Sequence, residues 1–168
     1  MNNFIDIEDI DSNQLKKIIA DSAGLKAERK DNSKGTKDFK KYLKNKVVAL
    51  LFKKPSTRTR FSFEVGIFQM GGQTITVSSN EMQLSNFESM SDTSRVLSQY
   101  LDMVIIRTDN HSDLIDLTKY SNIPIINGLS DKSHPCQVLS DIFTFEEIIG
   151  SIKGKKVVWL GDSNNLCN

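Results

Sequence analysis

The fold is decided by the stretch Val47-Val48-Ala49-Leu50-Leu51-Phe52-Lys53-Lys54-Pro55-Ser56-Thr57-Arg58-Thr59-Arg60. Its first six residues are all apolar, which is typical of a β-strand buried on both faces of a parallel sheet. Pro55 ends the strand, and Ser56 or Thr57 can cap a following helix. The stretch therefore predicts a strand that is joined to a helix by a basic, hydroxyl-rich turn.

This turn has the composition of an anion-binding site. The first N–H groups of a helix lack intrahelical acceptors, and the helix dipole makes that end positive. Arg58 and Arg60 add cations where cations are disfavoured, so a bound anion is needed to compensate them. We interpret the hydroxyls of Ser56 and Thr57 and the Arg58 guanidinium as a phosphate cradle. The alternative is that these residues only cap and solvate the helix.

Strand and helix patterns alternate along the chain. A first helix is predicted over 13–25, and Phe61, Val65 and Phe68 predict the apolar face of the helix after the turn. The strands are predicted at 47–52, 73–77, 103–107, 123–127 and 156–160. This alternation predicts an α/β fold, a doubly wound, mainly parallel sheet flanked by helices on both faces. Ligands of such sheets bind beyond the carboxyl ends of the strands.

Length and charge limit the classes of function. The chain has 168 residues, enough for one domain, and a net charge of +1 from 22 basic and 21 acidic residues. This balance argues against nucleic acid and anionic membrane as partners. No signal peptide and no apolar run of about 20 residues is evident, so we expect a cytoplasmic protein that binds small molecules. Cys136 and Cys167 lack metal-site or disulfide spacing and are expected to be thiols.

Two further segments follow predicted strands. Arg107 closes an apolar run, so its guanidinium is expected at the same sheet edge as the turn, where two arginines can share one phosphate. His134-Pro135-Cys136-Gln137 opens a helix, and Pro135 suits the first helical position. The helix dipole there lowers the pKa of His134, and a neutral imidazole can donate a hydrogen bond to a carbonyl oxygen.

These segments carry a resemblance. Lys54-Pro55-Ser56-Thr57-Arg58-Thr59-Arg60, followed by Ser62-Phe63-Glu64, resembles the carbamoyl phosphate motif of the aspartate and ornithine carbamoyltransferases. His134-Pro135-Cys136-Gln137, with Asn127-Gly128-Leu129 before it, is similar to the second motif of that family. The likeness covers nearly the whole chain. It implies an enzyme that transfers the carbamoyl group of carbamoyl phosphate to an amine.

The resemblance also implies roles for single residues. The carbamoyl phosphate site would consist of Ser56, Thr57, Arg58, Thr59, Gln83, Arg107, His134, Pro135, Cys136 and Gln137. The catalytic members would be Arg58, Arg107, His134 and Gln137, with His134 polarising the carbonyl and Gln137 accepting from the carbamoyl NH₂. Cys136 is expected to be a spectator. Because carbamoyl phosphate carries its own leaving group, no metal and no organic cofactor is expected.

The acceptor is inferred from the resemblance alone. Gln83-Leu84 and Glu88-Ser89 fit the ornithine-specific branch, although Ser85-Asn86-Phe87 departs from its pattern. The resemblance implies a homotrimer in which Gln83 enters the site of a neighbouring subunit. Asn165 matches a residue that holds L-ornithine, and the product would be citrulline. Carbamoylation of aspartate or another amine, and a catalytically silent phosphate-binding module, remain open as alternatives.

The domain organisation follows from the same likeness. Residues 1–150 are expected to form the carbamoyl phosphate-binding domain, and residues 151–168 a linker with the first strand and loop of a truncated ornithine-binding domain. Trp159 is expected in the core. Asp92 and Arg95 are interpreted as an exposed helix pair, and His111 as a residue that caps the following helix or faces water.

Overall fold

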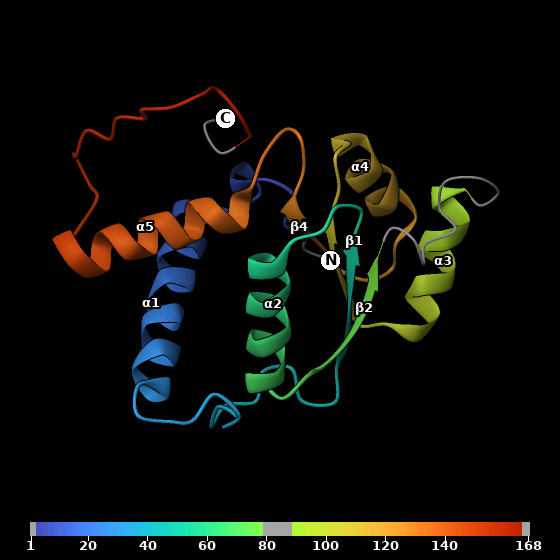
Figure 1. Cartoon of the computed structure of the whole chain (residues 1–168), viewed down its shortest axis with the longest axis horizontal. Helices are drawn as coiled ribbons and strands as arrows, with labels where there is room; N and C mark the ends of the chain where they lie inside the picture. Colours follow the sequence, from blue (N-terminus) through green and yellow to red (C-terminus); the bar gives the residue numbers. More distant parts are fainter. Residues whose placement is uncertain (1–2, 79–88, 166–168) are drawn as a thin grey trace.

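The computed structural model describes residues 3–78 and 89–165 of the chain (Figure 1). The elements in chain order are η1 (Ile7–Asp9), α1 (Ser12–Arg29), β1 (Val47–Phe52), α2 (Thr57–Gln69), β2 (Gln73–Ser78), α3 (Met90–Tyr100), β3 (Met103–Arg107), α4 (His111–Tyr120), β4 (Ile125–Leu129) and α5 (Pro135–Ile149). From β1 onward strands and helices alternate, as the sequence predicts. None of the helices in these two ranges is long and apolar enough to span a membrane.

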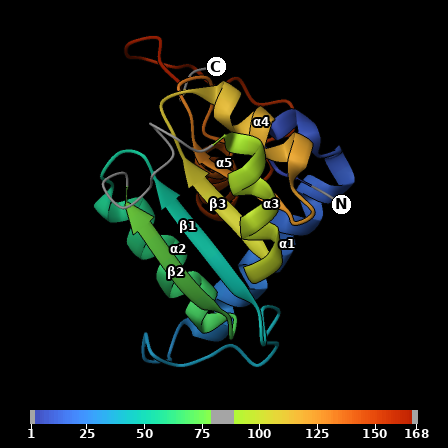
Figure 2. The ribbon, with the colours of Figure 1, turned by 90° about the vertical axis from the view of Figure 1, so that its right-hand side faces the viewer.

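The four strands form one parallel sheet in the order β2-β1-β3-β4. Phe52 at the end of β1 lies opposite Arg107 at the end of β3, and Arg107 lies opposite Leu129 of β4. Because all strands run in one direction, their carboxyl ends share one edge, which the arrowheads in Figure 2 mark.

β1 is buried because its side chains alternate between two hydrophobic clusters. Val48, Leu50 and Phe52 pack in the cluster that α2 covers. Ala49 and Leu51 pack in the other cluster, to which α3 and α4 contribute. Figure 1 shows α1, α2 and α5 on one side of the sheet, and α3 and α4 on the other. The predicted doubly wound α/β fold is confirmed.

The chain changes direction across the sheet between β2 and β3. From β1 it passes through α2 to β2 at one edge, and it then returns through α3 to β3 on the far side of β1. In open α/β sheets, ligands bind where the strand order reverses in this way. The turn after β1 and the end of β3 flank this switch point.

The predicted apolar face of α2 is wrong. Phe61 and Phe68 are 60% and 43% exposed, and Val65 is 39% exposed. The helix instead packs on the sheet through Ile67, which is 3% exposed, and Phe63. Both sets of residues have helical spacing, so periodicity alone cannot decide which of two apolar rows faces the sheet.

Two element boundaries also differ from the prediction. β4 starts at Ile125 rather than Ile123, because Pro124 has no N–H to donate to a ladder. Ile123 is nevertheless buried against the sheet. α1 continues to Arg29, where the guanidinium donates two hydrogen bonds to the buried Asp38 carboxylate.

The predicted strand over residues 156–160 is not formed, and residues 151–165 contain no helix or strand. Trp159 was expected in the core, but it is 48% exposed and its indole N–H donates to the Asp162 carbonyl 3.0 Å away. Leu160 is 91% exposed. A strand is stabilised by hydrogen bonds to a neighbouring strand, and this run pairs with none of the four described strands. The division of the chain at residue 150 stays a prediction.

Candidate anion-binding site at the carboxyl edge of the sheet

The turn after β1 presents uncapped donors. Ser56 occupies the N-cap position of α2, yet its side chain makes no capping hydrogen bond. The first turn also contains no acidic side chain that would balance the helix dipole. Ser56 and Thr59 are half-buried, whereas Thr57 and Arg58 are exposed. The expected cap is therefore absent, and the first N–H groups of α2 have no side-chain acceptor from Ser56.

The two arginines of this turn differ in their partners. Arg60 donates to the Glu64 carboxylate at 2.9 Å, and Glu64 also accepts from the Thr76 hydroxyl at 2.5 Å. The Thr76 hydrogen bond, and then Arg60, lower the pKa of Glu64. The Arg58 guanidinium has no hydrogen bond or ion pair with any residue that the structure describes. Of the two, Arg58 is the one available to an anion.

Arg107 is a partly buried cation without a counter-ion. Its Nη1 donates to the Thr59 hydroxyl at 3.3 Å, and its buried Nε has no hydrogen-bond partner. No carboxylate within the described ranges forms an ion pair with it. Burial lowers its pKa from the usual value, although a guanidinium remains charged at neutral pH. Desolvating an unpaired charge is costly, so this position favours an anionic ligand.

The turn between β4 and α5 is fixed by polar side chains that the sequence patterns did not reveal. Asn127 is fully buried, and its Nδ2 donates to the Ile5 carbonyl at 2.9 Å and the Ser133 carbonyl at 3.3 Å. The Ser130 backbone N–H also donates to the Ser133 carbonyl, at 3.0 Å. These bonds join the N-terminal segment to the turn and place His134 at the start of α5. An asparagine at the end of an apolar strand is the one sequence feature that indicates such a role, because a buried amide needs hydrogen-bond partners.

His134 is the N-cap residue of α5 and is 9% exposed. Its Nδ1 is buried without a partner. Burial and then the positive charge of Arg107 lower the pKa of the imidazole, while Asp141 opposes them. The lowered pKa agrees with the expectation of a neutral imidazole, and its causes are burial and the charge of Arg107.

Pro135, Cys136 and Gln137, which follow His134, lie in different surroundings. Pro135 is buried in the first turn of α5. The Cys136 thiol lies 3.4 Å from the Asn127 carbonyl oxygen, and burial raises its pKa to about 11. A thiol of this kind is a poor nucleophile, which fits the role of a spectator. Gln137 is half-buried, and its Nε2 donates to the Asp141 carboxylate at 2.9 Å.

Asn165 lies beside the same turn. Its Nδ2 donates to the Ser130 carbonyl at 2.6 Å, so the segment after α5 returns to the carboxyl edge of the sheet. His111 contacts this turn as well, because its Nδ1 lies 2.8 Å from the Ser130 hydroxyl. It is the first residue of α4 rather than its cap, which is Asn110. Gln83 and Cys167 lie outside the described residues.

Asp92 and Arg95 form the expected exposed pair, with 3.6 Å between Arg95 Nη1 and Asp92 Oδ1. Neither residue is placed in the site.

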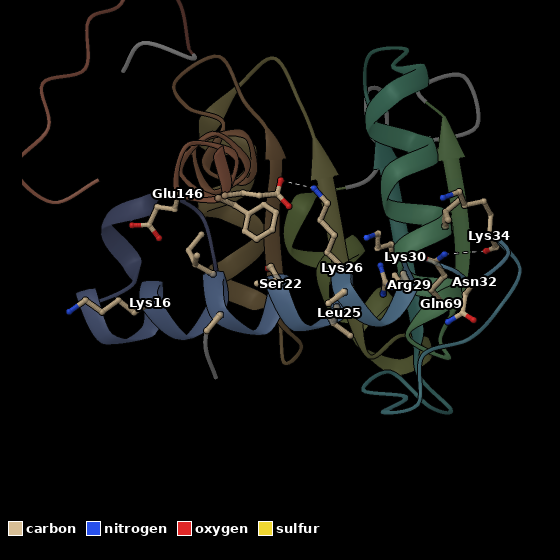
Figure 3. Close-up of a pocket in the computed structure, with 17 residues that line it drawn as sticks. Lys16, Ser22, Leu25, Lys26, Arg29, Lys30, Asn32, Lys34, Gln69 and Glu146 are labelled. Atoms are coloured by element: carbon tan, nitrogen blue, oxygen red, sulfur yellow. Dashed lines mark hydrogen bonds and ion pairs between the residues drawn. The ribbon is translucent and has the colours of Figure 1, made fainter. Parts of the chain in front are cut away.

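A large cavity lies away from this turn. A cavity of about 1120 Å³ lies between α1, α2 and α5, and side chains that include Ile19, Ala23 and Phe143 line it (Figure 3). The Lys26–Glu147 ion pair, at 2.7 Å, is among its charged lining. A smaller cavity of about 500 Å³ adjoins the turn after β1 and is lined in part by Ser56 and Thr57. The chemistry of the turn, rather than cavity size, marks the candidate site.

The residues of the candidate anion site thus come from the ends of β1, β3 and β4. Arg107 contacts Thr59 directly, and the charge of Arg107 acts on His134. The fold and this candidate site define a class of protein, an open α/β domain whose topological switch point carries the groups that suit an anion.

The chain belongs to the aspartate/ornithine carbamoyltransferase family, because the family model for its carbamoyl-P binding domain matches residues 2–147. An ornithine carbamoyltransferase of Ruegeria pomeroyi is 50% identical over 168 residues, which are 100% of this chain and 54% of that protein. One of Paracoccus denitrificans is 50% identical over 167 residues, 99% of this chain and 54% of the relative. The structure of ornithine carbamoyltransferase from Pyrococcus furiosus matches with a TM-score of 0.92 and 40% identity, over 99% of this chain and 51% of that one. The chain spans about half the length of the curated relatives it matches.

Proposed function

We propose that this chain binds carbamoyl phosphate and supplies that half of an ornithine carbamoyltransferase site. The observation that carries the proposal is Arg107, a partly buried guanidinium whose one hydrogen bond within the described residues goes to the neutral Thr59 hydroxyl. It lies next to the uncapped N-terminus of α2. A phosphate dianion supplies the negative charge that these groups lack.

The phosphate is held by Ser56, Thr57, Thr59 and the first N–H groups of α2, together with Arg58. Arg107 bridges the phosphate and the carbamoyl carbonyl oxygen. As the amine attacks the carbonyl carbon, negative charge grows on the carbonyl oxygen and then on the departing phosphate. Preorganised donors at those two places each lower the barrier by about 3–4 kcal/mol. Pro135 and Cys136 position the start of α5 and take no part in the proton transfers.

His134 donates a hydrogen bond to the carbonyl oxygen, and Gln137 accepts one from the carbamoyl NH₂. The low pKa of His134 supports its part, because burial and Arg107 keep the imidazole neutral. A neutral imidazole has one N–H donor, and it adds no further positive charge beside Arg107. Protein groups alone perform these tasks, without a metal or an organic cofactor.

The acceptor is proposed to be the δ-amine of L-ornithine, and the products citrulline and phosphate, as in arginine biosynthesis. The Ruegeria pomeroyi and Paracoccus denitrificans relatives are ornithine carbamoyltransferases, which supports ornithine over aspartate. Asn165 is the candidate acceptor-side residue, and its hydrogen bond to the Ser130 carbonyl holds it at the turn between β4 and α5. We further propose a cytoplasmic homotrimer in which Gln83 completes the site of a neighbouring subunit, and this rests on the family resemblance.

Calorimetric titration with phosphonoacetamide tests the proposal, since this compound keeps the amide and the phosphorus oxygens but does not hydrolyse like carbamoyl phosphate. Arg107→Met is expected to weaken binding at least about tenfold, the usual effect of losing a charge-assisted hydrogen bond. Arg95→Ala is the control, because it removes the same charge from an exposed pair on α3. Equal affinity in the unaltered chain and Arg107→Met would contradict the assignment.

A further inference from the structure

Asp141 lies one helical turn after Gln137 on α5. The carboxylate oxygen Oδ1 accepts the hydrogen bond from Gln137 Nε2 at 2.9 Å. Asp141 itself is exposed, so this contact contributes little to the core. The main effect of the contact is therefore on the orientation of the Gln137 amide.

The contact fixes the orientation of that amide. An ionised carboxylate only accepts hydrogen bonds, and of the two ends of a glutamine amide only the NH₂ donates. With Nε2 turned toward Asp141, Oε1 is turned away from it. An asparagine at position 141 would accept from Nε2 equally well, but it would also donate to Oε1, so both orientations of the amide would be satisfied.

We infer that Asp141 is a positioning residue that holds the Gln137 amide with its oxygen toward the bound carbamoyl group. This inference rests on the proposed function. A carbamoyl NH₂ is a donor and matches Oε1, whereas a carboxylate in the same place is an acceptor and is repelled by it. Asp141 therefore makes the site selective for a carbamoyl group over a carboxylate of the same shape. The charge of Asp141 also acts on His134, where it opposes the lowering of the pKa by burial and Arg107.

Selectivity between two stable probes tests this role. Phosphonoacetamide and phosphonoacetate differ only in an amide and a carboxylate, and both can be titrated into the 168-residue chain by calorimetry. Asp141→Asn is expected to narrow the preference for the amide by about 3- to 10-fold, the usual effect of one hydrogen bond. Asp141→Glu restores an acceptor-only group and is expected to recover most of the preference. Glu147→Gln removes an exposed carboxylate from the far end of α5 and is expected to leave the preference unchanged.

A double-mutant cycle separates orientation from charge. Removal of the negative charge of Asp141 favours the binding of any anion. This charge effect does not depend on the Gln137 amide, so it persists when Gln137 is replaced by alanine. The orientation effect requires the amide, so the Gln137→Ala chain is expected to show a smaller change in preference on adding Asp141→Asn. An identical change in both backgrounds would overturn the inference.

The outcomes also distinguish the inference from the proposed function. If the unaltered chain binds neither probe, the proposed function and the inference both fall. If it prefers phosphonoacetamide and Asp141→Asn keeps the whole preference, the inference alone is overturned. Thermal unfolding of each variant verifies that it is folded.

Discussion

Arg107 Nη1 and the Thr59 hydroxyl, 48 residues apart in the chain, lie 3.3 Å from one another. This hydrogen bond joins the end of β3 to the first turn of α2 at the switch point of the sheet. The partner is neutral, so it orients the guanidinium without compensating its charge. In the proposed function the site is assembled in advance for phosphate, and the negative charge of the phosphate would offset the unfavourable burial of the cation.

Replacing this cation is expected not to destabilise the ligand-free chain. Arg107→Met keeps an apolar stem of similar length and removes the desolvated charge. We expect the unfolding temperature without ligand to be unchanged or to rise by about 2–4 °C, which corresponds to about 1 kcal/mol. Phosphate should no longer raise it. Thermal unfolding with and without phosphate measures both effects, and a lower unfolding temperature with the phosphate effect retained would contradict the prediction.

The two arginines of the turn should respond in opposite ways. Arg58→Ala is expected to weaken phosphate binding about tenfold and to change the free energy of unfolding by less than about 0.5 kcal/mol, because Arg58 is exposed. Arg60→Ala should cost about 0.5 kcal/mol of stability through the lost contact with Glu64, with little effect on phosphate. Calorimetry measures the phosphate affinity of the two variants, and urea unfolding measures their stability. Weaker phosphate binding by Arg60→Ala with unchanged binding by Arg58→Ala would assign the phosphate to Arg60.

Acidification should destabilise the chain through His134. The pKa of this imidazole is lowered in the folded state, so between the folded and the unfolded pKa the unfolded chain binds more protons. The contribution of His134 to the free energy of unfolding is therefore complete above the pKa of histidine in the unfolded chain, near 6.5. It is lost as the pH falls below that value, by at most about 1.4 kcal/mol per pH unit.

The check is urea unfolding at pH 7.5 and 5.5 with His134→Gln as the control. The variant should lose less stability on acidification than the unaltered chain. The carboxylates with lowered pKa, such as Glu64 and Asp102, lose their contribution only at lower pH. Equal losses in both chains would show that His134 does not carry this dependence.

Cys136 should react slowly with alkylating reagents. A thiol with a pKa of about 11 is deprotonated to a very small extent at pH 8, so its alkylation should be about 100-fold slower than that of an ordinary cysteine. Iodoacetamide labelling followed by peptide mass spectrometry gives the rate at Cys136. The rate should become ordinary in denaturant, and fast labelling of the folded chain would contradict the assigned burial.

The 168 residues alone are expected to bind carbamoyl phosphate but to form citrulline slowly. Holding two reactants together contributes about 7–11 kcal/mol, and the acceptor-side candidate on this chain is Asn165. A fusion of this chain to the second half of the Paracoccus denitrificans relative supplies the part of that relative that this chain does not match. A citrulline assay with saturating ornithine should show much faster turnover by the fusion, and equal turnover would place the acceptor site within these residues.

Local sequence patterns are sufficient to predict the fold class and the strand ends that carry the candidate site. A buried strand such as β1 needs an unbroken apolar run, and a turn with Pro55 and two hydroxyls is typical of a helix start. These are local properties, set by neighbours in the chain. For the same reason the positions of β1, α2 and β3 could be predicted closely.

Which helix faces are covered and which charges are paired depends on the packing of elements that are distant in the chain. Two apolar rows on α2 have helical spacing, and the row with Phe63 and Ile67 is the one that packs against the sheet. Two arginines of similar sequence context differ because Arg60 donates to the Glu64 carboxylate, which also accepts from the Thr76 hydroxyl of β2, whereas Arg58 has no such partner among the described residues. The hydrogen bond between Asn127 and Ile5 spans 122 residues, and no local pattern signals it. Burial, pairing and pKa depend on atoms that are distant in sequence, and folding alone brings those atoms together.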